Sequence, residues 1–367
     1  MIRILHAADL HLDSPFQALD REQAAARRAE QRTLLERMAR MVQSRRVDLV
    51  LLAGDLLDGD SPYPETARLM EQVLSQIGVP VFIAPGNHDW YGPSCLWSRL
   101  DLGENVHIFN SEDIRCVELP ALNARVWGAA FLDKHRSAPL AGFESPDKGD
   151  TMDIMVLHGE VTEAATPYGP ISREDIARSG MDYIALGHVH TYSGLCRAGD
   201  TYYAWPGCPE GRGFDETGEN GVLLVELEPG QCRTQFVPLN GRQYEIITVD
   251  LTDSTDHAAT VVAALGRDTA RDIYRIRLTG EPAREPDVPA LTEALADKFY
   301  ALQLRDETRL RRDVWDSRDE DSLRGLFLAR LWKQYQATDE EAQRDILSRA
   351  AKYGLRALEG GDELPIA

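Results

Sequence analysis

Five short polar motifs follow one another along the first half of the chain, each directly after an apolar stretch. They contain a set of side chains that can bind metal ions: Asp9, His11, Asp55, Asn87, His158, His188 and His190. Four imidazoles, two carboxylates and one carboxamide make a mixed nitrogen and oxygen set without a thiolate. Such a set suits Mn, Fe or Zn and differs from the all-oxygen shells of calcium. We expect two divalent metal ions, with Mn as the first choice and Fe, Zn or Mg as alternatives.

A pair of divalent ions at these residues would activate a water molecule to cleave a phosphate ester. Two carboxylates against two dications leave a charge of about +2, which attracts phosphate even in an acidic protein. Taken singly, each signal has a simpler explanation, because a lone His in a strand is more often a core residue and a lone Asp after a strand more often a turn residue. The ordered set, with flanking glycines that allow close approach, favours the metal site.

The spacing inside the motifs predicts how these side chains converge. In an extended segment, residues i and i+2 point to the same side. Asp9 and His11 should therefore face one cavity together, as should His188 and His190.

Adjacent residues of an extended segment diverge, so His88 should point toward the substrate while Asn87 turns its amide oxygen to a metal. Asp89 would be available to orient His88 or nearby basic groups. The remaining histidines have the simpler interpretation of satisfied core residues, and they are His6, His107, His135 and His257.

Short apolar, β-branched runs alternate with helical patterns through the first half of the chain. The expected strands are 2–8, 47–53, 79–84, 152–157 and 182–186. The expected helices are 16–46, 64–77 and 172–179. This α/β pattern places the motifs in loops that follow strand ends, where open sheets hold their ligands.

Beyond residue 191 the pattern changes to closely spaced strands with Gly and Pro between them. Strands at 201–205, 221–228 and 233–237 predict a second, largely antiparallel sheet that packs face to face with the first. The domain that holds the motifs would then span residues 1–240.

Two further regions complete the expected organisation. Residues 241–290 resemble a small β-α-β capping domain, and everything after Pro289 reads as helix, which gives a helical C-terminal region at 291–367. Amphipathic helices are expected there at about 320–336 and 339–358.

The formal net charge of −20 bears on the substrate. DNA binding draws much of its free energy from Lys and Arg side chains that neutralise phosphates, so an acidic chain should bind DNA poorly by itself. One stretch runs against the trend, because Arg21–Arg46 holds eight arginines and three acids. This helix, Arg212 and the strand Arg271–Arg277 are the candidate DNA contacts, although a solvated helix face is the simpler alternative for the helix.

Neither the N-terminus nor the cysteines indicate an exported protein. Asp9 comes too soon for a signal-peptide apolar segment, and no apolar run reaches the roughly 20 residues of a membrane helix. The five cysteines are odd in number and form no Cys-x-x-Cys pair, so neither a disulfide framework nor a zinc knuckle is indicated. We expect a cytoplasmic protein that does not associate with membranes.

At these motifs the chain resembles the calcineurin-like metallophosphoesterase superfamily over about residues 1–240. Its Asp-x-His, Gly-Asp-x-x-Asp, Gly-Asn-His-Asp/Glu, His and Gly-His-x-His elements are all present. Within the superfamily, residues 6–16 and 206–212 are similar to the DNA repair exonuclease branch of SbcD-like and YhaO-like proteins. The resemblance implies an α/β fold, a four-layer α-β-β-α metallophosphoesterase sandwich with the dimetal site at the sheet edge.

The resemblance also implies a role for each residue. One ion would be held by Asp9, His11, Asp55 and His190, and the other by Asp55, Asn87, His158 and His188. Asp55 would bridge the ions, His88 would be the general acid, and Asp58 would have a supporting role. C-terminal helices of this branch dock an SbcC-like coiled-coil ABC ATPase, which is therefore the expected protein partner; homodimer formation stays open.

Together these expectations predict a metal-dependent phosphodiesterase, a DNA exonuclease or endonuclease subunit that acts in DNA repair. Two alternatives remain open. The first is a small-molecule phosphodiesterase or phosphatase that uses the same dimetal site. The second is a metal-binding scaffold without catalysis.

Overall fold

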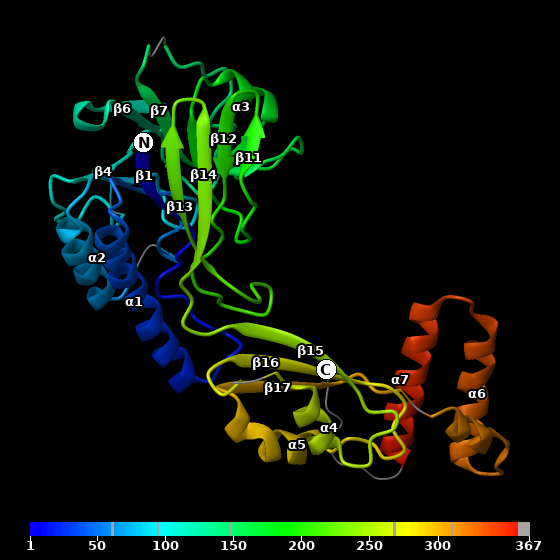
Figure 1. Ribbon diagram of the computed structural model, residues 1–367. Helices are drawn as coiled ribbons and strands as arrows, with labels where there is room; N and C mark the ends of the chain where they lie inside the picture. The colour runs from blue at the N-terminus through cyan, green and yellow to red at the C-terminus, as the bar shows by residue number, and fades with distance from the viewer. Residues whose placement is uncertain (60–61, 94, 147–148, 267–268, 310, 359–367) are drawn as a thin grey trace. The chain divides into compact units, whose positions relative to one another are not determined.

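The computed structural model describes residues 1–358 except 60–61, 94, 147–148, 267–268 and 310. The chain divides into two compact units, Met1–Gln243 and Tyr244–Ala367 (Figure 1). Within the described residues, no helix is long and apolar enough to span a bilayer.

Two six-stranded sheets, counted over the described residues, form the centre of the first unit. The first sheet has the order β14-β13-β1-β2-β3-β4, with bounds Gln231–Pro238, Gly221–Glu228, Ile2–Ala7, Leu49–Leu52, Val81–Ile83 and Val106–Ile108. The second has the order β11-β12-β10-β7-β6-β5, with bounds Cys196–Ala198, Thr201–Ala204, Tyr183–Gly187, Met152–His158, Ala124–Gly128 and Arg115–Leu119. Shorter elements of this unit are β8 (Glu160–Val161), β9 (Pro170–Ile171) and the 3₁₀ helix η1 (Pro120–Leu122).

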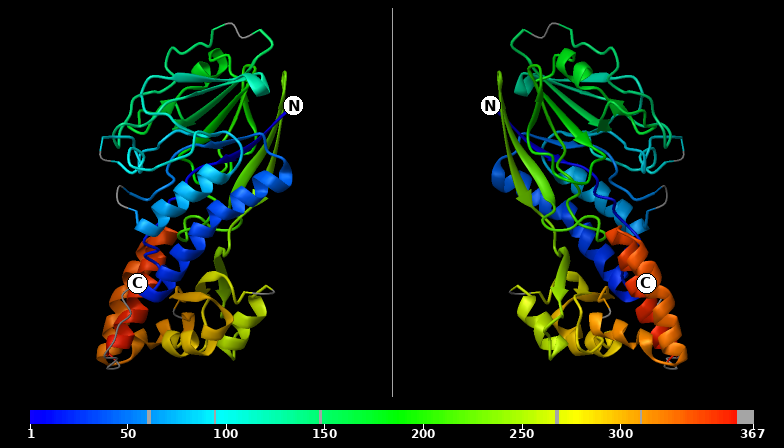
Figure 2. Two further views of the ribbon diagram at one scale, coloured as in Figure 1. Left: turned by 90° about the vertical axis from the view of Figure 1, so that its left-hand side faces the viewer. Right: turned by 90° about the vertical axis from the view of Figure 1, so that its right-hand side faces the viewer.

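Alternating burial lets each sheet pack on both of its faces. Helices α1 (Arg21–Arg45) and α2 (Pro64–Gln76) cover the outer face of the first sheet, where they meet residues such as Val50 (Figure 2). Residues of opposite parity, such as Leu49, face the second sheet. Helix α3 (Arg173–Arg178) covers the outer face of the second sheet. The order of layers is α-β-β-α, and the predicted four-layer α/β fold is confirmed.

The prediction of a separate antiparallel sheet after residue 200 is wrong. Strands β13 and β14 form a hairpin that extends the first sheet, with Val225 of β13 opposite Ile4 of β1. Strands β11 and β12 instead extend the second sheet beside β10. An alternating pattern reveals which side of a strand is buried, but it does not encode the neighbouring strand.

The second unit begins with a parallel sheet of order β15-β16-β17, with bounds Tyr244–Asp250, Ile273–Thr279 and Ala301–Asp306. Helices α4 (His257–Ala264) and α5 (Val288–Leu295) pack against this sheet. The 3₁₀ helices η2 (Ala296–Lys298) and η3 (Arg312–Asp319) lead to α6 (Leu323–Ala337) and α7 (Glu341–Leu358). The last two helices lie side by side and share a small core with Trp315 (Figure 1).

Strand β17 corrects the expectation of helix throughout after Pro289. Its residues Leu302 and Leu304 alternate with polar neighbours, which is the period of two typical of a strand. The strand has only six residues, too few for this period to stand out in the sequence. The strand adds to the sheet of the expected β-α-β cap, beyond the expected boundary at residue 290.

Candidate metal centre

All five motifs lie at the carboxyl ends of parallel strands, His158 as the last residue of β7 and the other ligands in the loops that follow. Strands β1, β2 and β3 run parallel in the first sheet, and β7 and β10 run parallel in the second. The carboxyl ends of parallel strands share one edge, so each sheet gathers its own motifs. The backbone N–H of His188 then donates to the carboxylate of Asp9 at 3.0 and 3.1 Å, which joins the two edges.

The backbone at this edge is left-handed rather than extended. Four candidate ligands have positive φ: Asp9 (53°), His11 (42°), Asp55 (51°) and His188 (97°). Such a conformation costs about 1–3 kcal/mol per non-glycine residue and concentrates at functional sites. The loop after β1 is held against the loop after β2, since Asp9 N–H donates to Gly54 O at 3.0 Å and His11 N–H to Asp55 O at 2.9 Å.

The ligand side chains converge for a different reason than the predicted alternation of residues i and i+2 in an extended segment. Asp9 and His11 lie beyond β1 and do reach a common group, but through turns and not through strand alternation. His188 and His190 lie beyond β10 and belong to different ligand groups of the same site.

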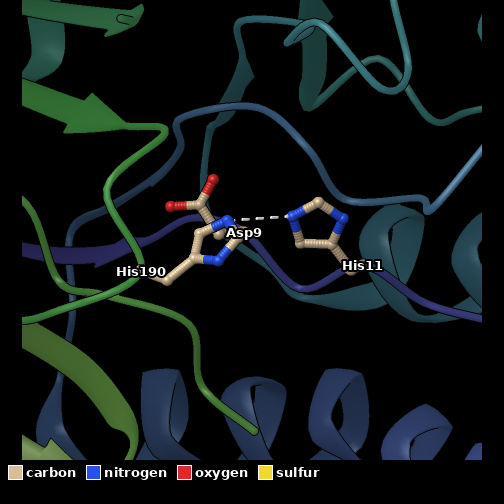
Figure 3. A group of neighbouring side chains, drawn as sticks. All are labelled: Asp9, His11 and His190. Atoms are coloured by element: carbon tan, nitrogen blue, oxygen red, sulfur yellow. Dashed lines mark hydrogen bonds between the residues drawn. The ribbon is translucent and has the colours of Figure 1, made fainter. Parts of the chain in front are cut away.

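The first ligand group consists of Asp9, His11 and His190, whose ligand atoms lie within 4.8 Å of one another (Figure 3). The Nε2 atoms of the two imidazoles face each other at 3.3 Å. The Nδ1 atom of His11 lies 3.0 Å from Asp58, and that of His190 lies 2.8 Å from Glu216. Nδ1 of His190 also lies 3.0 Å from the guanidinium of Arg212. In the tautomers in which Asp58 and Glu216 accept the Nδ1 protons, both Nε2 lone pairs point to the same place, as a shared cation requires.

The second ligand group consists of Asp55, His158 and His188. His158 donates from Nδ1 to Ala53 O at 2.8 Å, which leaves its Nε2 lone pair free. That Nε2 atom lies 3.0 Å from Oδ1 of Asn87, which is also 3.2 Å from Nδ1 of His188. When His158 is neutral, as a metal ligand must be, this is a contact between two acceptors that a cation would resolve; when the ring is protonated, Nε2 donates to Asn87.

Asp55 lies between the two groups. Its Oδ2 atom is 3.7 Å from Nε2 of His11 and 3.4 Å from Nε2 of His158, while its Oδ1 atom accepts the backbone N–H of His88 at 2.8 Å. One carboxylate oxygen is therefore within reach of both ligand groups.

Burial sets the charge state of the ligands. It lowers the pKa of both His11 and His188 to about 4, which keeps these rings in the neutral form that binds metals. Burial also raises the pKa of Asp9 to about 6. Against the lowering effect of burial, the charge of Asp55 raises the pKa of His158 to about 9. A cation beside Asp55 replaces that proton, as metal binding commonly does, so the donor set fits two divalent ions.

The three candidate catalytic residues have different surroundings. His88 is exposed, and its ring centre lies 4.8 Å from that of His11. Asp58 accepts from His11 and from Arg212, at 3.0 and 3.2 Å. Burial would raise the pKa of the Asp58 carboxyl, but the hydrogen bond from His11 and the charges of both neighbours bring that pKa below its ordinary value.

Asp89 does not orient His88, and this part of the prediction is wrong. Its carboxylate is only 4% exposed and accepts backbone N–H groups from Gly86 and Leu56 at 2.8 Å and from Asp55 at 3.2 Å. A carboxylate that accepts several backbone donors fixes the loop that contains them. Asp89 therefore holds Asp55 in position from behind the site.

Sequence reasoning missed Glu216. Its side chain is 4% exposed, lies against Nδ1 of His190 and forms an ion pair with Arg212. Arg212 also donates to Asp58, so one guanidinium joins the two carboxylates that orient the rings of the first ligand group. No signal separates Glu216 from the exposed acids near it, because only the folded loop brings it to His190.

A cavity of about 300 Å³ opens beside the second ligand group. Its lining is Asp58, Gly59, Asn87, His88, Trp90, Lys134, His135 and Tyr168. His135 was expected in the core, but it is exposed, and its ring centre lies 5.8 Å from that of Tyr168. The Lys134 ammonium lies 5.5 Å from the ring centre of Trp90. The cavity therefore presents aromatic faces and positive charge next to the ligands.

Only one of the four presumed core histidines is a core residue. His6 is fully buried and joins the two sheets through Tyr183 OH at 2.9 Å and Leu186 O at 3.1 Å. His107 is exposed on β4, and His257 is half-buried at the start of α4.

The chain belongs to the calcineurin-like phosphoesterase family, whose model matches residues 2–192, just over half of the chain. It is therefore a phosphoesterase hydrolase of a family that uses a dimetal site.

Three relatives lie within or beside the DNA repair branch. The chain is 28% identical over 337 residues to the uncharacterized metallophosphoesterase YhaO of Bacillus subtilis strain 168, covering 87% of this chain and 81% of that protein. It is 25% identical over 253 residues to the DNA double-strand break repair protein Mre11 of Methanopyrus kandleri, covering 62% and 55%. It is 22% identical over 284 residues to the SbcD component of nuclease SbcCD of Staphylococcus epidermidis, covering 69% and 74%. The predicted resemblance to this superfamily and branch is confirmed.

Proposed function

We propose that the chain hydrolyses phosphodiesters with two divalent ions, Mn²⁺ first among them, and that its substrate is DNA. It would act as the nuclease component of a DNA repair system. One observation carries the proposal: two ligand groups meet at Asp55 beside the exposed imidazole of His88.

The assignment of ligands follows the two groups. One ion would be held by Asp9, His11, Asp55 and His190, and the other by Asp55, Asn87, His158 and His188; Asp55 would serve both because its Oδ2 is within reach of both groups. When bound, the two ions supply Lewis-acid activation of a water molecule and stabilise the charge that develops on the phosphoryl oxygens.

The chain's own residues orient these ligands and move the proton. His88 donates a proton to the departing oxygen, because its ring is exposed at the cavity and belongs to neither of the two ligand groups assigned to the ions, although with His11 and Asp58 it forms a third possible group. Asp58 and Glu216 hold the rings of His11 and His190 in the tautomers that keep Nε2 free. Asp89 fixes the loop of the bridging carboxylate.

A single-stranded or unpaired segment of DNA fits the cavity chemistry. Trp90 and Tyr168 offer ring faces for bases, and such stacking tolerates any sequence. Lys134 adds a cation beside the rings. The names of two relatives, a break repair protein and a nuclease component, point to the same substrate class.

One observation favours the alternative, a small-molecule phosphodiesterase or phosphatase. Several of the arginines expected to bind DNA are neutralised within the fold: Arg27 pairs with Glu30 and Glu210, Arg32 with Asp13, Arg212 with Glu216 and Arg277 with Glu307. A cavity of about 300 Å³ is also at the lower end of the range for small-molecule sites.

Hydrolysis of bis-p-nitrophenyl phosphate tests the chemistry. The reaction should require Mn²⁺ and stop with chelator. His88→Ala should keep both metals and lower turnover by about 10²–10⁴-fold, whereas Asp55→Ala should lose metal. Equal metal loss in both variants would overturn the roles assigned to these residues.

Cleavage of single- and double-stranded DNA, compared with mononucleotides and cyclic nucleotides, tests the substrate. Tyr168→Ala should lower DNA cleavage more than hydrolysis of the small diester, with Tyr63→Ala, an exposed tyrosine outside the cavity lining, as control. Efficient action on mononucleotides with no DNA cleavage would favour the small-molecule enzyme.

We also propose that the protein is cytoplasmic and that α6 and α7 dock an SbcC-like coiled-coil ATPase. The support is that three large apolar side chains of these two helices are exposed, Leu323 to 68%, Leu326 to 69% and Ile346 to 54%, and exposed apolar surface can mark a protein interface. Leu323→Asp with Leu326→Asp should abolish association with the ATPase and leave hydrolysis of the small diester unchanged. Association that survives both substitutions would exclude this surface.

A further inference from the structure

A second concave site lies on the first unit, away from the metal ligands. It is a cleft of about 480 Å³ lined by residues of β1, β13, β14 and the C-terminal end of α1: Arg3, Ile4, Ser44, Arg45, Arg46, Val47, Leu224, Val225, Glu226, Arg233, Thr234 and Gln235. Its volume is within the range of ligand sites. Four arginines and one acid line it, in a chain whose net charge is −20.

The cleft arises where α1 stops and the sheet continues. The outer face of the first sheet is apolar under the helix, where Leu5 and Leu224 pack against it. In the strand pairing, Arg3 lies opposite Glu226, which in turn lies opposite Arg233. Since every second residue points to the same side, this polar row lies on the same outer face as the apolar residues. Arg45 and Arg46, at the end of α1, complete the wall.

Among the described residues, most of the positive charge of the cleft has no acidic partner. Arg3 is 3.3 Å from Glu226, but in the part of the chain that the structure describes, the guanidinium groups of Arg45, Arg46 and Arg233 have no ion-pair partner. These three side chains are exposed and converge on one cavity. Three other arginines of α1 differ, since Arg27, Arg32 and Arg40 each pair with an acid.

We propose that this cleft binds phosphate groups of a ligand, at a site separate from the metal centre. Guanidinium groups bind phosphate oxygens through paired hydrogen bonds, and several on one concave surface suit a polyphosphate or successive phosphates of a nucleic acid strand. Ser44, Thr234 and Gln235 add hydroxyl and amide donors at the wall.

Strand β1 separates the cleft from the metal ligands. Arg3 lies at its amino end and Asp9 follows its carboxyl end. At a rise of about 3.3 Å per residue, the two sites are roughly 20 Å apart. The cleft therefore holds phosphates that are not being cleaved.

Binding of inorganic pyrophosphate to the full chain in EDTA tests this site, because chelation removes phosphate binding by the metal centre. Arg45→Gln combined with Arg233→Gln should weaken binding at least tenfold. Glu226→Gln removes the acid of the lining and should strengthen it. Arg40→Gln, the same change on an exposed arginine of the same helix, should leave binding unchanged.

Two results would overturn the proposal: equal pyrophosphate binding by the double variant and the wild type, or an equal loss in Arg40→Gln. A labelled oligonucleotide then identifies the source of the phosphates. Parallel weakening of oligonucleotide binding in the double variant assigns the site to a nucleic acid strand, and weakening of pyrophosphate alone assigns it to a small phosphorylated ligand. Hydrolysis of the small diester should be the same in all variants.

Discussion

Glu216→Gln removes one negative charge from behind His190 and nearly preserves the side-chain shape. In the folded chain, Glu216 is 4% exposed, lies 2.8 Å from Nδ1 of His190 and pairs with Arg212, which is itself 18% exposed. The substitution therefore weakens the hydrogen bond that fixes the ring and leaves a buried guanidinium with Asp58 as its remaining ionic partner.

The expected size of the effect comes from the position of Glu216. Loss of a carboxylate that orients a metal-binding His typically lowers metal affinity by about 10–100-fold, or about 1.4–2.7 kcal/mol. The upper end is expected here, because both Glu216 and Arg212 are largely buried and their lost interaction is little screened by solvent. The effect should fall on the ion of the first ligand group, since Glu216 contacts His190 and no residue of the second group.

Calorimetric titration of chelator-treated protein with Mn²⁺ measures the two binding steps separately. Asp215→Asn is the matched control, because it removes the same charge from the adjacent, exposed residue. One step should weaken about 100-fold in Glu216→Gln, with the other step and the control unchanged. Unchanged affinity in Glu216→Gln, or an equal loss in Asp215→Asn, would refute the reasoning.

Three further predictions concern stability. Asp89→Asn replaces an acceptor of several backbone N–H groups, so it should lower the free energy of unfolding in urea by about 1–3 kcal/mol. An unchanged urea midpoint of unfolding would show that the conformation of this loop does not depend on the Asp89 carboxylate. Lys352→Ala leaves the carboxylate of Asp306 without its buried ion-pair partner at 2.6 Å and should cost about 3–5 kcal/mol, whereas Lys333→Ala, for which no ion pair is found among the described residues, should cost little. Burial lowers the pKa of His6 to about 3, below its ordinary 6.5, so the unfolded chain binds the proton more tightly, and stability should fall as pH drops from 6.5 toward 3. His6→Gln should flatten this pH dependence, and an equally steep dependence in the variant would assign it to other groups.

The sequence was most informative where residue type and order carry the chemistry. The ligand residues could be found because Asp9 and His188 follow buried strands and His158 ends one, and parallel strands end at one edge. Their backbone could not be predicted, because left-handed φ at Asp9 or His188 depends on hydrogen bonds between loops. Glu216 was missed for the same reason.

The sequence also did not predict which strands and which charged side chains, far apart along the chain, lie next to each other in the fold. Strand β13 was expected, but its place beside β1 depends on contacts between residues such as Val225 and Ile4, far apart in sequence. The basic helix shows the same limit for charge. Eight arginines suggested a DNA surface, yet Arg27 lies fully buried against Glu210, and only the folded chain brings Arg45 and Arg46 beside Arg233.

The left-handed backbone at the ligands has a consequence for the evolution of this protein. Four residues that each cost about 1–3 kcal/mol add up to a substantial part of the roughly 5–15 kcal/mol by which typical domains are stable. Glycine at any of these positions would relax the chain while removing a ligand. Laboratory selection for heat resistance alone should therefore accumulate inactive, more stable variants at Asp9, His11, Asp55 or His188. Activity must be selected together with stability to retain them.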